Sequence, residues 1–167
     1  MAMDAITITT AMMLSLFNNN IGSDKFIYNT EFNDLQEVCA KTVFEKNSEN
    51  GCFQKKLRYQ YVYDAQKRLL AKEVQAWDEP SGKWDNAYRL EYKYAPEETS
   101  VTCMKWDSRT NDYSNMKDKI IYSQLDEHVL SVSNYTWDEK DCDWALVSRM
   151  AAYDPTNELL YTDNRSK

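Results

Sequence analysis

The chain has little glycine, proline and histidine, and it lacks the motifs of the best understood enzymes. Its 167 residues include three Gly, three Pro and a single His, His128. It contains no G-x-S-x-G elbow, no H-E-x-x-H pair and no glycine-rich phosphate loop. His128 follows an expected turn, and the sequence identifies no nucleophile that it could activate. We therefore expect a protein that is not an enzyme.

Clustered positive charge is also missing. The formal net charge is −7, and no block of Lys or Arg interrupts the acidic background. Nucleic acids and anionic membrane surfaces are bound by groups of neighbouring cations. We therefore expect neither nucleic acid nor a membrane surface as a partner, and no stable membrane insertion.

What the chain has in abundance is aromatic side chains. Twelve Tyr, five Trp and five Phe bury large apolar areas, while Tyr and Trp keep a polar group available for water. This composition favours a β-sheet with a wet face over a helical bundle. The four cysteines lack metal-site spacing, and we expect mostly free thiols with one bridge possible. They are Cys39, Cys52, Cys103 and Cys142.

Residues 1–23 differ from the rest of the chain. Ala5–Phe17 carries no charge, and the six residues that follow are small and polar or apolar. The uncharged run is too short for a membrane span but has the length of a signal-peptide core, although a basic start is absent. We expect a signal-peptide-like segment at 1–23, a single domain at 24–167, and a secreted, periplasmic or cell-surface location. The alternative is an N-terminal helix or strand that packs on the domain.

A Trp-Asp pair followed by a second aromatic residue occurs three times at a nearly constant interval. The copies are Trp77-Asp78 with Trp84, Trp106-Asp107 with Tyr113, and Trp137-Asp138 with Trp144, and the Trp-to-Trp steps are 29 and 31 residues. Phe44 and Phe53 form a looser first copy. Self-similarity at such a period indicates a repeat architecture.

Alternation of apolar and polar residues predicts what each repeat contains. In Phe53–Tyr63, Leu57 and three tyrosines lie on one face while Arg58 and Gln60 lie on the other, as in a half-buried strand. The same pattern predicts strands at 25–29, 37–46, 53–63, 68–77, 84–94, 101–106, 113–122, 129–137, 144–153 and 158–161.

Short loops between these strands predict an all-β antiparallel meander of about nine or ten strands, built from repeated hairpins in one long curved sheet. A rolled or barrel-like sheet is the alternative. The aromatic after the loop lies ten residues from the next Tyr in the early repeats and nine in the later ones. We therefore expect a bulge or register shift in the later repeats.

Two resemblances add to these predictions. Tyr61-Val62-Tyr63-Asp64 followed by Arg68-Leu69 resembles the core of YD repeats in bacterial surface and toxin-shell proteins. Over nearly all of the chain after Asp24, the segments 24–31, 41–44 and 61–64 and the Trp-Asp loops resemble DUF3836, a Bacteroides family of unknown function. This second resemblance implies an exported all-β protein and supplies no catalytic residues.

Two kinds of side chain are candidates for a site. Asp138, Asp141 and Asp143 offer oxygen ligands to Ca²⁺, although the same residues also suit a turn that needs acceptors for backbone N–H groups. The aromatic pairs invite stacking on sugar rings, although they also suit packing across a hairpin. These ligand candidates are Trp77, Trp84, Trp106, Tyr113, Trp137 and Trp144.

Three functional hypotheses follow. The first is an exported, non-enzymatic binding or adhesion module for a glycan or a protein, without a cofactor. The second is a small hydrolase acting on glycans through two carboxylates. The third is a structural or inhibitory protein that pairs with a partner through a sheet edge.

Overall fold

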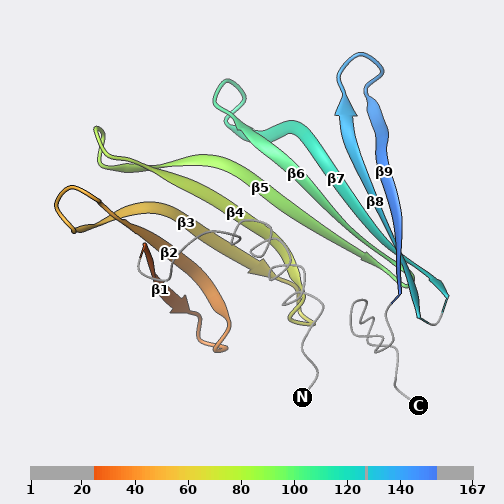
Figure 1. Cartoon of the computed structure of the whole chain (residues 1–167), viewed down its shortest axis with the longest axis horizontal. Coiled ribbons are helices and arrows are strands. Elements are labelled where there is room, and N and C mark those ends of the chain that lie inside the picture. Colours follow the sequence, from red (N-terminus) through yellow and green to blue (C-terminus); the bar gives the residue numbers. More distant parts are fainter. Residues whose placement is uncertain (1–24, 127, 154–167) are drawn as a thin grey trace. The chain divides into compact units, whose positions relative to one another are not determined.

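The computed structural model describes residues 25–126 and 128–153, and within them the chain forms nine β-strands and no helix (Figure 1). The expected segment at 1–23 and the expected last strand at 158–161 lie outside the described residues. The strands are β1 (Phe26–Phe32), β2 (Val38–Lys46), β3 (Phe53–Tyr63), β4 (Leu69–Asp78), β5 (Lys83–Ala95), β6 (Glu98–Asp107), β7 (Asp112–Asp126), β8 (Val129–Asp138) and β9 (Asp143–Tyr153).

The strands form one open antiparallel sheet in the order in which they follow each other along the chain (Figure 1). The predicted meander is therefore confirmed. β1 and β9 are the two edges of the sheet, so the barrel-like alternative is wrong. No helix in the described part of the chain is long and apolar enough to span a membrane.

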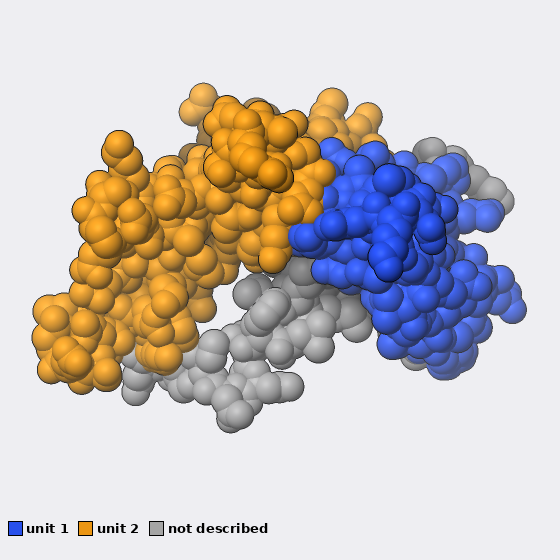
Figure 2. Space-filling model, turned by 90° about the horizontal axis from the view of Figure 1, so that it is seen from above, with its two compact units in different colours: residues 1–17, 91–104, 116–167 blue, residues 18–90, 105–115 orange. Residues whose placement is uncertain are grey.

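The chain divides into two compact units, which are coloured separately in Figure 2. Among the described residues, the N-terminal unit holds the chain up to Leu90 together with Lys105–Asn115. The C-terminal unit holds Glu91–Met104 and the chain from Met116 onward. Each unit has its own buried apolar side chains. They are Ala40, Val43, Leu69, Ala71, Val74 and Leu90 in the N-terminal unit, and Tyr92, Val101 and Leu130 in the C-terminal unit.

The register of the first and last hairpins shows how the repeat is built. In β8 and β9, Trp137 lies directly opposite Trp144, with a connection of six residues from one Trp to the other. In β2 and β3, Lys46 lies opposite Phe53 across a loop of the same length. The first copy of the repeat is therefore Lys46-Asn47 with Phe53, and our assignment of Phe44 to this position was wrong. Loop geometry sets the register of a hairpin, and here it overrides the aromatic pattern.

A β-bulge also recurs at the same position of these hairpins. The register shift between Val43 and Phe44 leaves Lys56 without a partner, and the shift between Asn134 and Tyr135 does the same to Val147. Each extra residue follows the aromatic after the loop by three positions. The expected bulge in a later repeat is confirmed, but the first repeat carries it too. The bulge therefore does not explain the difference between ten-residue and nine-residue spacings.

The four long hairpin loops share one backbone device. The fifth loop residue has a positive φ in each: 71° at Gly51, 65° at Gly82, 54° at Asn111 and 50° at Cys142. Glycine adopts this left-handed conformation without steric cost, whereas most L-residues are strained by roughly 1–2 kcal/mol. The last loop therefore places an unfavourable residue at a position where the other loops carry Gly or Asn.

Replacing Cys142 by glycine is expected to raise the free energy of unfolding by about 1 kcal/mol, because the strain at φ 50° is relieved. The weak hydrogen bond from Cys142 Sγ to the Glu139 carbonyl, at 3.6 Å, is a small loss. Urea denaturation measures the difference. Cys52→Gly is the matched control, because Cys52 is also an exposed thiol in a long loop but has no positive φ. Equal shifts in the two variants would contradict the assignment of strain to position 142.

Candidate functional site

The three predicted aromatic pairs form three nearly identical contacts. The ring centroids lie 5.0 Å apart for Trp77 and Trp84, 4.9 Å for Trp106 and Tyr113, and 5.1 Å for Trp137 and Trp144. The interplanar angles are 67°, 69° and 72°, so each pair packs edge to face. In the β8–β9 hairpin this arrangement follows from the register, which places Trp137 opposite Trp144 where the strands enter the loop.

Such a pair is worth about 0.5–1.5 kcal/mol beyond the area that it buries. The packing across the hairpin that we considered in the sequence is therefore present in all three copies. All six rings remain partly exposed. Ligand binding by these residues stays a prediction, and the surroundings of each pair decide which of them offers a site.

The aspartates of the loops are engaged in forming the turns. Oδ1 of Asp138 accepts the backbone N–H groups of Lys140 at 2.8 Å and Asp141 at 3.4 Å, and Oδ1 of Asp143 accepts that of Trp144 at 2.7 Å. Across residues 25–126 and 128–153, no group of three or more His, Cys, Asp or Glu could hold a metal ion. The geometry therefore gives the calcium interpretation of Asp138, Asp141 and Asp143 no support.

The loop after Trp106 uses its aspartate in the same way. Oδ1 of Asp107 accepts the backbone N–H of Arg109 at 2.9 Å, and the carboxylate also pairs with the Arg109 guanidinium at 3.3 Å. These side-chain and backbone hydrogen bonds from Arg109 lower the pKa of Asp107 below its usual value. In both of these loops the aspartate after Trp thus fixes the turn.

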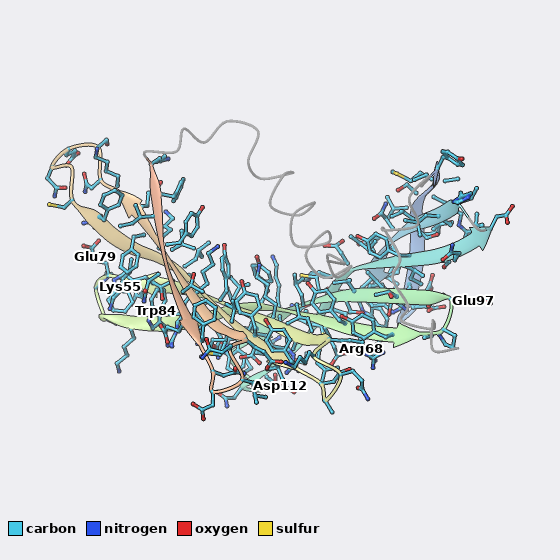
Figure 3. All side chains as sticks on the ribbon, turned by 90° about the horizontal axis from the view of Figure 1, so that it is seen from below. Lys55, Arg68, Glu79, Trp84, Glu97 and Asp112 are labelled. Atoms are coloured by element: carbon cyan, nitrogen blue, oxygen red, sulfur yellow. The ribbon has the colours of Figure 1, made fainter. Side chains whose placement is uncertain are left out.

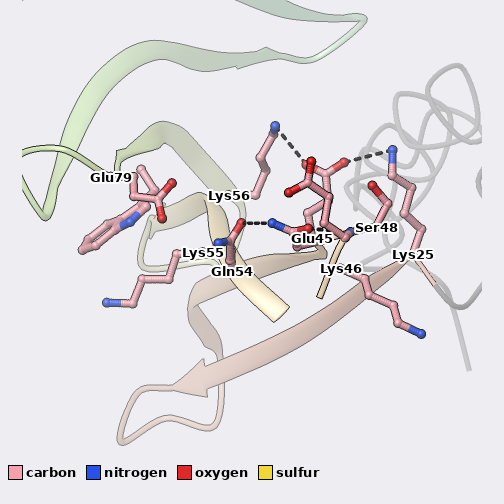
Figure 4. A pocket seen from close by; sticks show the side chains of 11 residues that line it. Lys25, Glu45, Lys46, Ser48, Gln54, Lys55, Lys56 and Glu79 are labelled. Carbon is pink, nitrogen blue, oxygen red and sulfur yellow. Dashed lines mark hydrogen bonds and ion pairs between the residues drawn. The ribbon is translucent and has the colours of Figure 1, made fainter. Parts of the chain in front are cut away.

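A cavity of about 700 Å³ lies in the N-terminal unit, at the loop end of the β2–β3 hairpin and beside the end of β4. Of the six aromatic residues proposed to bind a ligand, Trp77 alone lines this cavity. Its remaining lining is polar (Figure 4). These residues are Lys25, Glu45, Lys46, Asn47, Ser48, Glu49, Gln54, Lys55, Lys56 and Glu79.

Two groups of side chains occupy opposite ends of the cavity (Figure 4). At one end, Glu45 binds the ammonium groups of Lys25 and Lys56, each at 2.9 Å. Hydrogen bonds from Lys56 and Lys25 lower the pKa of Glu45. A carboxyl held in its ionised form in this way is unsuited to act as the general acid of a glycosidase.

At the other end, the ammonium group of Lys55 lies over the Trp77 ring, 4.1 Å from its centroid, and 5.9 Å from the centroid of Trp84. Lys55, Glu79 and Trp84 lie close together at this end of the N-terminal unit (Figure 3). Lys55 is an exposed side chain on a flexible stem, so its ammonium group is free to move when a ligand arrives. Trp84 packs edge to face against Trp77, and Trp77 lines the cavity.

Sequence reasoning identified Trp77 but missed the rest of the cavity. Glu45 and Lys56 belong to β2 and β3, Lys25 directly precedes β1, and the three meet only because the hairpin register brings them together. Asn47 takes the place of the loop aspartate, and its amide lies 3.4 Å from Gln54 Oε1. No motif marks these residues in the chain.

The one histidine has a packing role in the structure. The ring of His128 lies 6.0 Å from that of Tyr153 at an angle of 68°. Tyr153 is the last described residue of β9, and 71 % of its surface is exposed. Nothing in this contact resembles a base poised beside a nucleophile.

Comparison with known proteins shows relatives of the same fold. A protein with unknown function from Bacteroides fragilis NCTC 9343 is 21% identical, with a TM-score of 0.66, and the match covers 81% of this chain and 96% of that one. A DUF3836 family protein from Parabacteroides distasonis ATCC 8503 is 24% identical, with a TM-score of 0.52, over 59% of this chain and 89% of that one. A third, from Bacteroides vulgatus ATCC 8482, is 24% identical, with a TM-score of 0.50, over 55% and 90%.

At these identities the similarity establishes the fold alone, and no curated protein matches the chain. Export and the likeness to YD repeats stay predictions. The family resemblance, in contrast, is confirmed by a family model that matches residues 1–124. The chain belongs to DUF3836, a family of unknown function.

Proposed function

We propose that this protein is a non-enzymatic module that binds a glycan in the cavity beside Trp77. The observation that carries the proposal is the lining of this cavity, in which one indole stands among polar side chains. A sugar presents an apolar C–H face and a rim of hydroxyl groups. The lining supplies a partner for each, an aromatic ring for the face and amide, hydroxyl and charged groups for the rim.

The size of the cavity and the fixed position of Trp77 support the same proposal. A volume of about 700 Å³ lies within the range of sites for small ligands and accommodates more than one sugar ring. Trp77 is held by Trp84 at 5.0 Å, so little conformational entropy is lost when a ligand stacks on it. A hydrolase that uses Glu45 is less well supported, because its ion pairs remove this one of the three lining carboxylates as a proton donor. A secreted, periplasmic or cell-surface location, and a protein partner at the rim or at a sheet edge, remain our further proposals.

Trp77→Ala is expected to weaken glycan binding by tenfold or more, roughly the loss of 1.4 kcal/mol, because the stacking surface disappears. A glycan array with the full chain identifies a bound glycan, and titration calorimetry then measures the affinity of each variant. Trp137→Ala is the matched control. It removes the same edge-to-face contact, at 5.1 Å, from the equivalent loop of the other unit.

The control also separates binding from folding, because both variants lose an equivalent aromatic contact and are expected to lose similar stability. Binding lost in Trp77→Ala and kept in Trp137→Ala supports the cavity as the site. If the full chain binds no glycan on the array, or if both variants bind as the parent chain does, the proposal fails.

A further inference from the structure

One face of the N-terminal unit carries an alternating series of tyrosines and lysines, which we call the tyrosine–lysine row. Its members are Tyr28 in β1, Lys41 in β2, Tyr59 and Tyr61 in β3, and Lys72 in β4. Lys41 lies opposite Tyr59, and Tyr61 lies opposite Lys72. Tyr28 lies opposite Val43, two residues from Lys41. Because side chains opposite each other and at every second position share a face, all five lie on the same face.

In this row the lysines sit on tyrosine rings. The ammonium group of Lys41 lies 4.4 Å from the centroid of the Tyr28 ring. That of Lys72 lies 4.0 Å from the centroid of Tyr59 and 5.9 Å from that of Tyr61. A cation over a ring is stabilised by the ring's quadrupole, but the ring carries no charge that would neutralise it.

The one carboxylate that the register of β1 to β4 places on this face is that of Glu45, two positions beyond Val43, and it is paired with Lys25 and Lys56. The register places Thr30, Val43, Leu57, Val74 and Ala76 between and around the members of the row. The acidic residues of β1 and β4 that fall within this register lie on the opposite face, where Glu31 pairs with Arg58 at 3.8 Å and Glu73 with Arg89 at 3.5 Å. Neither Lys41 nor Lys72 has a carboxylate within 4.0 Å among the residues that the structure describes.

Within residues 25–126 and 128–153, the two ammonium groups therefore have no carboxylate partner, and they repel each other. Burial, together with the charge of Lys41, lowers the pKa of Lys72 from 10.5 to about 8. Lys41 and Lys72 therefore form a local positive surface in a chain whose net charge is −7. An anion placed against both lysines gains their attraction and relieves their repulsion.

The form of the surface indicates what kind of anion fits it. The row crosses four neighbouring strands spaced about 4.8 Å apart, so its members extend across the sheet. Its tyrosines offer rings as well as hydroxyl groups, and Tyr28 is 52 % exposed. An extended ligand that alternates anionic groups with apolar ring faces matches this pattern of cations and aromatics.

We propose that the tyrosine–lysine row binds an acidic polysaccharide, with its carboxylate or sulfate groups on Lys41 and Lys72 and its sugar rings against Tyr28 and Tyr59. This surface is separate from the cavity, since none of the five residues lines it. The inference goes beyond the proposed function and does not rest on it.

The test compares four probes against the full chain: polygalacturonate, dextran sulfate, unmodified dextran and inorganic sulfate at the same sulfate concentration as the dextran sulfate. Both acidic polymers are expected to bind, and their affinity is expected to fall as salt is added. Lys72→Met is expected to weaken both by about tenfold or more, since it removes one of two cations but keeps an apolar side chain of similar length. Removing a partly buried, unpaired charge is not expected to unfold the chain.

Lys119→Met is the matched control. It makes the same change of charge at a lysine that also lies over an aromatic ring, 5.8 Å from the Trp144 centroid, but in the other unit. Its binding is expected to stay within twofold of the parent chain. Trp77→Ala is expected to keep its binding of the acidic polymers, which separates this surface from the cavity.

A second readout needs no substitution. Acetylation at pH 8 followed by mass spectrometry reports the accessibility of each lysine, and the acidic polymers are expected to protect Lys72 selectively. Binding of dextran as tight as that of dextran sulfate, or equal losses in Lys72→Met and Lys119→Met, would overturn the proposal. Protection of Lys72 by inorganic sulfate equal to that by dextran sulfate would also overturn it, because it would identify a small-anion site.

Discussion

Replacement of Leu69 by alanine is expected to lower the free energy of unfolding by about 3 kcal/mol. Leu69 is 1 % exposed, and with Val74 it is one of the two largest side chains that are fully buried in the described part of the chain. Truncation removes its apolar atoms from the core and leaves a cavity against a sheet whose strands are held in position by their hydrogen bonds. The loss is a large fraction of the stability of a domain of this size.

Urea denaturation followed by tryptophan fluorescence measures this effect. Leu125→Ala is the control, because it deletes the same atoms from a side chain that is 63 % exposed, and it is expected to change stability by less than about 0.5 kcal/mol. Similar losses in the two variants would show that Leu69 is not packed as the structure describes. A loss confined to Leu69 would locate the core of the N-terminal unit at the start of β4.

The sequence predicted the strands well because alternation and loop length act together. Phe53–Tyr63 matches β3 at both ends, and the strands beside the Trp-Asp loops begin or end within one residue of the expected positions. β7 shows where this reasoning fails. Its expected end was 122, but the strand continues to Asp126. The alternation of apolar and polar residues stops at 122, but the pairing of Gln124 with Leu130 extends the strand beyond this point.

Aromatic residues could not predict which residues of the first hairpin correspond to the Trp-Asp pair of the others. Lys46 stands where the other hairpins have Trp, and Asn47 performs the task of the loop aspartate. Oδ1 of Asn47 accepts the backbone N–H of Glu49 at 2.8 Å, as Asp138 does for Lys140 at 2.8 Å. The first hairpin therefore keeps the side-chain hydrogen bond that forms the turn, although it lacks the aromatic contact.

The two candidate sites could be predicted only in part, for a physical reason. Trp77 was identified from the repeat, but the other lining residues come from β2, from β3 and from segments outside the strands. The tyrosine–lysine row is a property of four neighbouring strands, and its lysines are 31 positions apart in the chain. The sequence contains no block of consecutive basic residues, but the strand register can still bring lysines that are far apart in the chain onto one face.

The free energy of unfolding is expected to rise by about 1–2 kcal/mol between pH 8 and pH 10, because of Lys72. The pKa of this amine is 10.5 in its ordinary state and about 8 in the folded chain. Between these values the unfolded chain binds more protons at this group than the folded chain does, so stability increases with pH. As the pH falls through about 8, the ammonium form returns and this contribution is lost. The full shift would correspond to about 3 kcal/mol, and residual solvation of the side chain reduces it.

Above pH 10 the tyrosines of the same row reverse the trend. Burial, followed by the neighbouring Tyr88 and Tyr28, raises the pKa of Tyr59 from 10.0 to about 12, and burial also raises that of Tyr61. A raised pKa of this kind contributes stability below pH 10 that is lost as the pH rises toward 12. Stability is therefore expected to have a maximum near pH 10.

Urea titrations at half-unit intervals from pH 7.5 to pH 11 measure this profile, and Lys72→Met isolates the contribution of the amine. The variant is expected to lose the rise between pH 8 and pH 10 and to keep the decline above pH 10. Other lysines and the growing negative charge affect both chains alike, so the difference between the two profiles reports Lys72. Parallel profiles would mean that Lys72 is solvated like an ordinary lysine. The desolvation of Lys72 over Tyr59 in the folded chain would then be wrong, although the lysine would still carry its positive charge.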